Sequence, residues 1–119
     1  MAAYRRSVHS RIATLPASPA IALVTWIELE GGVARDPANA SRRRQHTDVL
    51  LAALTIHPLD DAVVMAYRAI VAARGFSRTR VFDRLIATTA IVHDATLLTM
   101  NGADFRDVPG LQLQAWEAP

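Results

Sequence analysis

The 119-residue chain contains no cysteine, so it can form neither disulfide bonds nor thiolate metal sites. Any metal ion that it binds must therefore rest on oxygen or imidazole ligands. Lysine is absent as well: all 13 basic residues are arginine, and the net charge is only +2. Arginine suits phosphate recognition, but GC-rich coding also produces arginine-rich chains. The composition alone therefore does not establish a nucleic-acid function.

Long apolar runs are also missing. No segment approaches the roughly 20 apolar residues of a membrane span, and the N-terminal MAAYRRSVHS lacks the apolar stretch of a secretory signal. We therefore expect a soluble, cytoplasmic protein with no membrane association. At 119 residues and 51% hydrophobic content, the chain is long enough for one core and too short for two domains. The sequence predicts a single domain over residues 1–119.

The chain alternates between helical periodicity and short apolar runs. The expected helices are residues 3–14, a short helix that Thr25 caps and that ends near Gly31 and Gly32, and residues 37–54, 61–74 and 80–93. The expected strands are residues 20–24, 55–59, 96–99 and 111–116, with a loop over 101–110. Strands that alternate with helices indicate an α/β fold with a parallel sheet.

Apolar residues in the 61–74 helix recur at helical spacing and predict a buried face. These residues are Val63, Val64, Tyr67, Ile70 and Val71. Asp60 and Asp61 place acid at the start of this helix, and Gly75 is positioned to end it.

Three acids occupy positions where α/β folds commonly carry a functional site. Ligands bind outside the carboxyl ends of parallel strands, and Glu28 and Asp104 each follow an expected strand. Asp83 stands in the first turn of the 80–93 helix, within an otherwise apolar stretch. Each acid also has an ordinary explanation: stabilisation by a helix N-terminus for Asp83, an Asx-type turn for Asp104 and a solvated helix face for Glu28. Together, three acids from separate segments favour a Mg²⁺ or Mn²⁺ site, because these ions prefer carboxylates and water.

The second half of the chain carries a long motif. Residues 83–90 read DRLIATTA, and they are followed by His93 and by TLLTMNGADF over residues 96–105. This block resembles the C-terminal signature of PIN domains of the VapC toxin type. Residues 25–33, TWIELEGGV, are similar to the segment that carries the second acid of the family, and residues 108–116 are similar to its last strand. The resemblance implies a PIN-like three-layer α/β fold, with a short parallel sheet flanked by helices.

In that family the metal site holds an acid from the first strand, a Glu after the second strand, an Asp at the start of a late helix and an Asp after the fourth strand. The last three correspond to Glu28, Asp83 and Asp104. The first has no counterpart, because residues 1–27 contain no Asp or Glu. We therefore expect an N-terminally incomplete PIN-like domain that lacks the first central strand, through a late start codon or a shortened chain.

The resemblance implies a Mg²⁺-dependent endoribonuclease, with Mn²⁺ as a possible substitute, whose catalytic and metal residues are Glu28, Asp83 and Asp104. Metal-activated water would hydrolyse RNA phosphodiester bonds and leave 5′-phosphate and 3′-hydroxyl ends. The implied partners are RNA, a small antitoxin protein and a second copy of the chain in a homodimer. The absent first acid leaves an alternative: a PIN-like remnant that binds an antitoxin or dimerises without cutting RNA.

Four polar residues near these acids are candidates for binding substrate. Thr79 and Arg80 precede Asp83, whereas Thr99 and Asn101 precede Asp104. Capping and solvation of the helix explain the first pair equally well, and hydrogen bonding at the strand end explains the second pair.

A run of three arginines, Arg42 to Arg44, could contact an RNA backbone or an acidic partner, but such a run is usually a solvated face. The four histidines lack the helical pair spacing of a zinc site and are interpreted as structural or surface residues. Trp26 and Trp116 are each embedded in apolar sequence, which favours packing over base stacking.

Overall fold

The computed structural model describes residues 19–116. Its elements are β1 (Ala20–Ala22), α2 (Leu23–Ala34), the 3-10 helix η1 (Pro37–Asn39), α3 (Ala40–Ala53), β2 (Thr55–His57), α4 (Asp61–Arg74), η2 (Arg78–Arg80), α5 (Val81–Val92), β3 (Leu97–Thr99), η3 (Gly102–Phe105) and β4 (Leu113–Ala115). The helix expected over residues 3–14 lies outside the described residues, and because residues 1–18 are not described, the expected absence of a first central strand stays a prediction.

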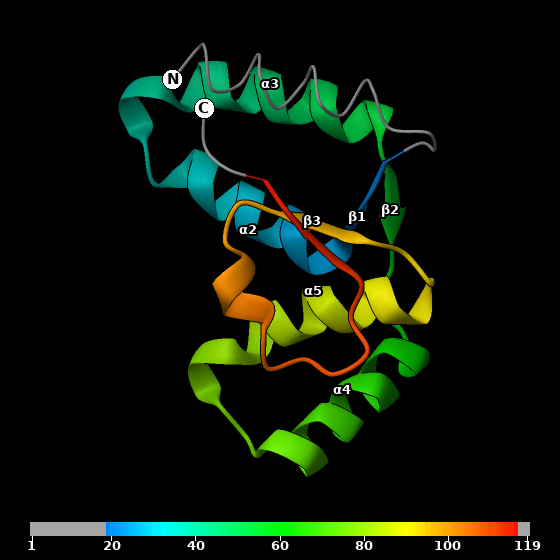
Figure 1. Ribbon diagram of the computed structural model, residues 1–119. Helices are drawn as coiled ribbons and strands as arrows, with labels where there is room; N and C mark the ends of the chain where they lie inside the picture. Colours follow the sequence, from blue (N-terminus) through cyan, green and yellow to red (C-terminus); the bar gives the residue numbers. More distant parts are fainter. Residues whose placement is uncertain (1–18, 117–119) are drawn as a thin grey trace.

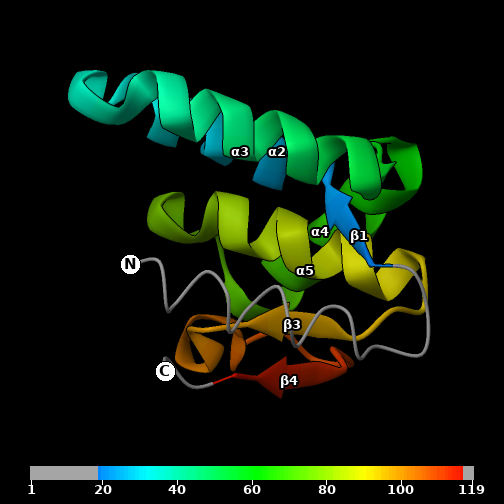
Figure 2. The ribbon, with the colours of Figure 1, turned by 90° about the horizontal axis from the view of Figure 1, so that it is seen from above.

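The strands are parallel, as predicted, and form two separate pairs within residues 19–116. β1 pairs with β2 so that Ile21 lies opposite Ile56, and β3 pairs with β4 so that Leu98 lies opposite Gln114. Figure 1 shows α3 at the top, α4 at the bottom and the strands at mid-height between them. Figure 2 shows β3 and β4 side by side and apart from β1. The predicted α/β architecture of short parallel strands flanked by helices is confirmed.

The boundaries of α4 follow from local chemistry. Asp60 caps the helix, because its Oδ1 accepts a hydrogen bond from the Val63 backbone N–H at 3.1 Å. Asp61 adds a negative charge to the first turn, where the helix dipole favours it. Gly75 ends the helix at a φ of 83°, a conformation that glycine adopts without the steric cost of a side chain.

The core forms where α4 and α5 pack against the loop after β3. Its buried members are Ile70, Ala87, Phe105 and Val108, and Ile86, Ile91, Leu97 and Leu111 pack against them. Val63 is 0% exposed and Ile70 is 4% exposed, as their spacing predicts. The prediction for Val64 is wrong, since its side chain is 48% exposed. Neighbouring helical residues point about 100° apart, so the face that buries Val63 turns Val64 toward the surface.

Other boundaries differ from the prediction by a few residues. α2 begins at Leu23, ahead of the expected cap at Thr25, and extends through Gly31 and Gly32 to Ala34. The helix expected from Pro37 begins as η1 and continues as α3, and the loop expected over 101–110 contains η3. Within residues 19–116, no helix combines the length and apolar character needed to span a bilayer.

Replacement of Ile70 tests this core. Ile70→Ala is expected to lower the free energy of unfolding by about 2–5 kcal/mol, because it removes buried methyl groups and leaves a cavity. Val64→Ala, on the exposed side of the same helix, should change it by less than about 0.5 kcal/mol. Urea denaturation of both variants measures the difference, and equal losses would contradict the assignment of the buried face.

Candidate functional site

The three predicted acids line one pocket. Glu28 comes from α2, Asp83 from α5 and Asp104 from η3, and the pocket that they share has a volume of about 800 Å³. Residues of β1 and β3 form much of its wall, and neither strand has a partner on its second edge within residues 19–116. Segments that lie far apart in the sequence thus bring three carboxylates to one place, between the two strand pairs.

Glu28 differs from its near neighbour Glu30 on the same helix. Glu30 Oε1 accepts from Arg44 Nη1 at 2.7 Å, and this hydrogen bond lowers the pKa of Glu30. Burial raises the pKa of Glu28, and the charge of Asp83 raises it further, while Arg35 opposes both. The exposure of Glu28 is compatible with the explanation of an ordinary solvated acid, whereas its place in the pocket beside Asp83 favours a functional site.

Asp83 interacts with acids on both sides. Burial raises its pKa above the ordinary value of 3.8, Asp104 and Asp107 raise it further, and Arg80 opposes them. A carboxylate that served only to complement a helix N-terminus would be stabilised in its charged form, and its pKa would fall. The direction of the shift argues against that ordinary explanation and is common at functional sites.

The carboxylate of Asp104 is not used in a local turn within the described part of the chain. The turn after β3 is held by other bonds: Asn101 N–H donates to Thr99 Oγ1 at 3.0 Å, and Asp104 N–H donates to the Asn101 carbonyl at 3.1 Å. Thr99 and Asn101 both line the acid pocket. Their bond matches the strand-end explanation, and their role in binding substrate stays a prediction.

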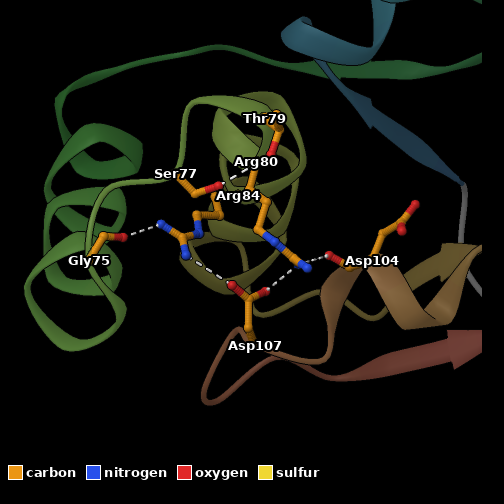
Figure 3. Close-up of polar contacts among 7 residues, drawn as sticks. All are labelled: Gly75, Ser77, Thr79, Arg80, Arg84, Asp104 and Asp107. Carbon is orange, nitrogen blue, oxygen red and sulfur yellow. Dashed lines mark hydrogen bonds and ion pairs between the residues drawn. The ribbon is translucent and has the colours of Figure 1, made fainter.

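A polar network joins the start of α5 to the loop after η3 (Figure 3). Arg84 is 3% exposed and donates to Asp107 Oδ2 at 3.0 Å and to the Gly75 carbonyl at 2.7 Å. Arg80 Nη1 lies 3.4 Å from Asp107 Oδ1 and 3.4 Å from the Asp104 carbonyl oxygen. Burial raises the pKa of Asp107, but the Arg84 hydrogen bond and the charges of both arginines outweigh this and lower it. Arg80 therefore contacts Asp107 and the backbone of Asp104, and its charge also acts on Asp83.

Thr79 lies beside this network and does not line the acid pocket. Its hydroxyl is 3.3 Å from the Ser77 hydroxyl, a contact within the turn that precedes α5. This contact is compatible with the capping explanation, and its role toward substrate stays a prediction.

Two residues near the site were not singled out in the sequence. Asp107 lies three residues after Asp104 and gave no signal of its own, because its partner Arg84 is 23 residues away. His57 lines the acid pocket, and its ring stacks on that of His93 with centroids 3.7 Å apart. Burial lowers the pKa of His57, and the neighbouring His93 lowers it further. These histidines have the structural role that the sequence suggested.

The arginine run is largely paired within the chain. Arg43 forms an ion pair with Asp36 at 3.1 Å, and Arg44 forms ion pairs with Glu30 and Asp48 at 2.7 Å each. Arg44 thereby links α2 to α3. Arg44 in this run thus holds two helices together, whereas Arg42 is exposed and forms no ion pair with the residues between 19 and 116.

The carboxylates of the three acids are suitable ligands for a hard cation, but they are not gathered closely around one point. Within residues 19–116, no group of three or more His, Cys, Asp or Glu side chains gathers closely enough to hold a metal ion directly. Mg²⁺ keeps several of its waters, however, and binds proteins through one or two carboxylates. Asp83, which interacts electrostatically with both Glu28 and Asp104, is the member of the set best placed to receive such an ion.

Replacement of Asp83 should stabilise the metal-free protein near neutral pH. A raised pKa means that stability is fully present below the ordinary pKa and is lost as the pH rises through the raised value. Asp83→Asn removes this loss, so its melting temperature should exceed that of the original chain at about pH 7. The two should converge at about pH 3, where carboxyl groups are protonated. Melting curves across this pH range check it, and a lower melting temperature for Asp83→Asn at neutral pH would contradict it.

Comparisons with known proteins agree with this architecture. The structure of VapBC2 from Rickettsia felis, bound to a DNA fragment from its promoter, is 26% identical, with a TM-score of 0.75 and coverage of 94% of this chain and 84% of that chain. DNA-bound VapBC from Salmonella typhimurium is 20% identical, with a TM-score of 0.78 and coverage of 92% and 83%. A toxin–antitoxin complex from Klebsiella pneumoniae is 24% identical, with a TM-score of 0.71 and coverage of 95% and 87%.

No curated protein matches the chain at a significant level. The family model described as the PIN domain, by contrast, matches residues 3–111, which is most of the sequence. The fold, the shared acid pocket and this match agree with one another, and the chain belongs to the PIN domain family.

Proposed function

We propose that this protein is a divalent-metal-dependent endoribonuclease, the toxin of a toxin–antitoxin pair. The observation that carries the proposal is the convergence of Glu28, Asp83 and Asp104 on one pocket from three separate segments. Membership of the PIN domain family and the likeness to VapBC structures support the nuclease class. The substrate, the metal ion and the roles of individual residues belong to the proposal.

The reaction is hydrolysis of an RNA phosphodiester. The oxygen of water forms a bond to phosphorus, the bond from phosphorus to the 3′ oxygen breaks, and that oxygen takes up a proton. Mg²⁺ or Mn²⁺, when bound, lowers the pKa of water and stabilises negative charge on the phosphoryl oxygens. Asp83 is assigned to hold the ion and to orient its bound water toward phosphorus, because it is the acid that interacts with both of the others. Glu28 and Asp104 share with it the task of holding the ion.

Arg80 is proposed to bind the substrate phosphate. Its side chain is 44% exposed, and its guanidinium group lies close to the Asp104 backbone. Guanidinium groups match phosphate geometry and remain charged at all physiological pH values. Thr79, Thr99 and Asn101 are proposed as further substrate contacts, the last two because they line the pocket.

The proposed protein partners follow from the relatives. The similar solved structures include toxin–antitoxin complexes, which supports a small antitoxin as an inhibitory partner of this chain. A homodimer is proposed in addition, and an RNA substrate implies action in the cytoplasm.

A second candidate function is a PIN-like binding module that no longer cuts RNA. It is favoured by the absence, within residues 19–116, of three ligands close enough to hold a metal ion directly. Such a module would keep its antitoxin or dimer surface but would show neither metal-dependent stabilisation nor metal-dependent cleavage. The two functions therefore differ in their response to Mg²⁺.

Cleavage of a labelled single-stranded RNA tests the proposal. The chain should cut RNA with Mg²⁺ or Mn²⁺ and not with EDTA, and Mg²⁺ should raise its melting temperature. Glu28→Gln, Asp83→Asn and Asp104→Asn should each reduce the cleavage rate by at least about 100-fold, since loss of even an outer partner of a metal site costs about 10–100-fold.

Asp61→Asn is the matched control. Asp61 lies in the first turn of α4, as Asp83 lies in the first turn of α5, and does not line the pocket. This variant loses the same charge and should cut RNA like the original chain. Cleavage that persists in EDTA or in Asp83→Asn would contradict the metal-dependent mechanism. The absence of both cleavage and a Mg²⁺ effect would favour the binding module.

A further inference from the structure

The Asp107 carboxylate holds two arginine side chains, one with each oxygen (Figure 3). Oδ2 accepts from Arg84 at 3.0 Å, and Oδ1 lies 3.4 Å from Arg80 Nη1. Because two guanidinium groups share a single carboxylate, this cluster carries a net positive charge. The charge lies beside the acid pocket, since Arg80 interacts electrostatically with Asp83 and contacts the Asp104 backbone.

The two arginines are held very differently. The Arg84 side chain is 4% exposed, and its Nη1 donates to the Gly75 carbonyl at 2.7 Å. Arg84 is thus fixed between the end of α4 and the loop that carries Asp107. The Arg80 side chain is 44% exposed, and its contacts with the described part of the chain are long, at 3.4 Å each. Arg84 therefore anchors the carboxylate, and the carboxylate in turn orients the more exposed Arg80.

We propose that Asp107 is a positioning residue, which Arg84 anchors and which holds Arg80 at the edge of the acid pocket to bind an RNA phosphate. The inference rests on the proposed ribonuclease function, because RNA supplies the phosphate. A guanidinium group has five N–H donors, so Arg80 keeps donors for phosphate while it contacts Asp107. Because Asp107 already restrains the Arg80 side chain, RNA binding should cost less conformational entropy.

Without Asp107, Arg80 would lose the carboxylate that it contacts within residues 19–116, while the charge of Asp83 would still attract it. The guanidinium group would then be drawn into the pocket or released to solvent. Either change removes a positive charge from the place where substrate would approach. The effect of Asp107 on RNA should therefore pass entirely through Arg80.

Fluorescence anisotropy of a short labelled single-stranded RNA tests this, with the full chain in EDTA so that binding is measured without metal or cleavage. Arg80→Ala should weaken binding about tenfold, as expected for one charge-assisted contact. It should also reduce the slope of log affinity against log salt by about 0.7, the value for one phosphate contact on a single strand. Asp107→Asn should produce both changes, and the double variant should bind no more weakly than Arg80→Ala alone.

If Asp107 had a merely structural role, its replacement would lower the melting temperature but leave the salt slope of RNA binding unchanged. A reduced slope therefore indicates that Arg80 has lost a phosphate contact. Arg78→Ala is the matched control, because Arg78 is an exposed arginine of the same 3-10 helix and should weaken binding much less. If Asp107→Asn does not fold, Arg84→Lys takes its place, since lysine keeps the charge but not the planar fork that grips Asp107. Its loss of RNA affinity should likewise vanish in the Arg80→Ala background.

Unchanged RNA affinity and salt slope in Asp107→Asn would overturn the inference. So would a double variant whose loss of affinity equals the product of the two single losses. A third contrary result is tighter RNA binding by Asp107→Asn. The last would mean that Asp107 withholds Arg80 from RNA. These results are distinguishable from failure of the proposed function, which is measured by metal-dependent cleavage and by the Mg²⁺ effect on melting. RNA binding in EDTA depends on neither.

Discussion

The partial burial of carboxylates beside one another in a single pocket is the constraint on which the proposed function of this protein depends. Burial disfavours the charged forms of Glu28 and Asp83, and each acid is further destabilised by a neighbouring carboxylate. The folded chain is therefore less stable near neutral pH than it would be without these charges. Structures keep such an unfavourable arrangement mainly where a function requires it. A divalent cation bound in the pocket would relieve the repulsion, which would link the stability of the fold to its proposed chemistry.

α5 connects the site to the rest of the fold. Its first turn carries Asp83, the next residue is the buried Arg84, and Ala87 on a later turn belongs to the core. The Arg84–Asp107 pair joins this helix to the loop after η3, so that Asp83 and Asp104 are held on elements that are tied to each other. Packing and the polar network thus hold Asp83 in place beside Asp104, although the charge of Asp83 lowers stability near neutral pH.

Much of this arrangement was predictable from local sequence signals. The ends of α4 follow from Asp60 and Gly75, and the convergence of Glu28, Asp83 and Asp104 follows from their positions after strands and at a helix start. The exposure of Val64 was not predicted, because periodicity alone does not define how wide a buried face is. The Arg84–Asp107 pair and the His57–His93 stack join distant segments, and such pairs leave no local pattern in a single sequence.

The central claim is that the shared acid pocket binds a divalent cation through Asp83 and its neighbours. Crystals of the full chain soaked in Mn²⁺, with diffraction recorded where manganese scatters anomalously, would locate the ion directly. The account predicts an anomalous peak in contact with the Asp83 carboxylate, within the pocket that Glu28 and Asp104 also line. A peak elsewhere on the molecule, or a pocket that stays without one at saturating Mn²⁺, would contradict it.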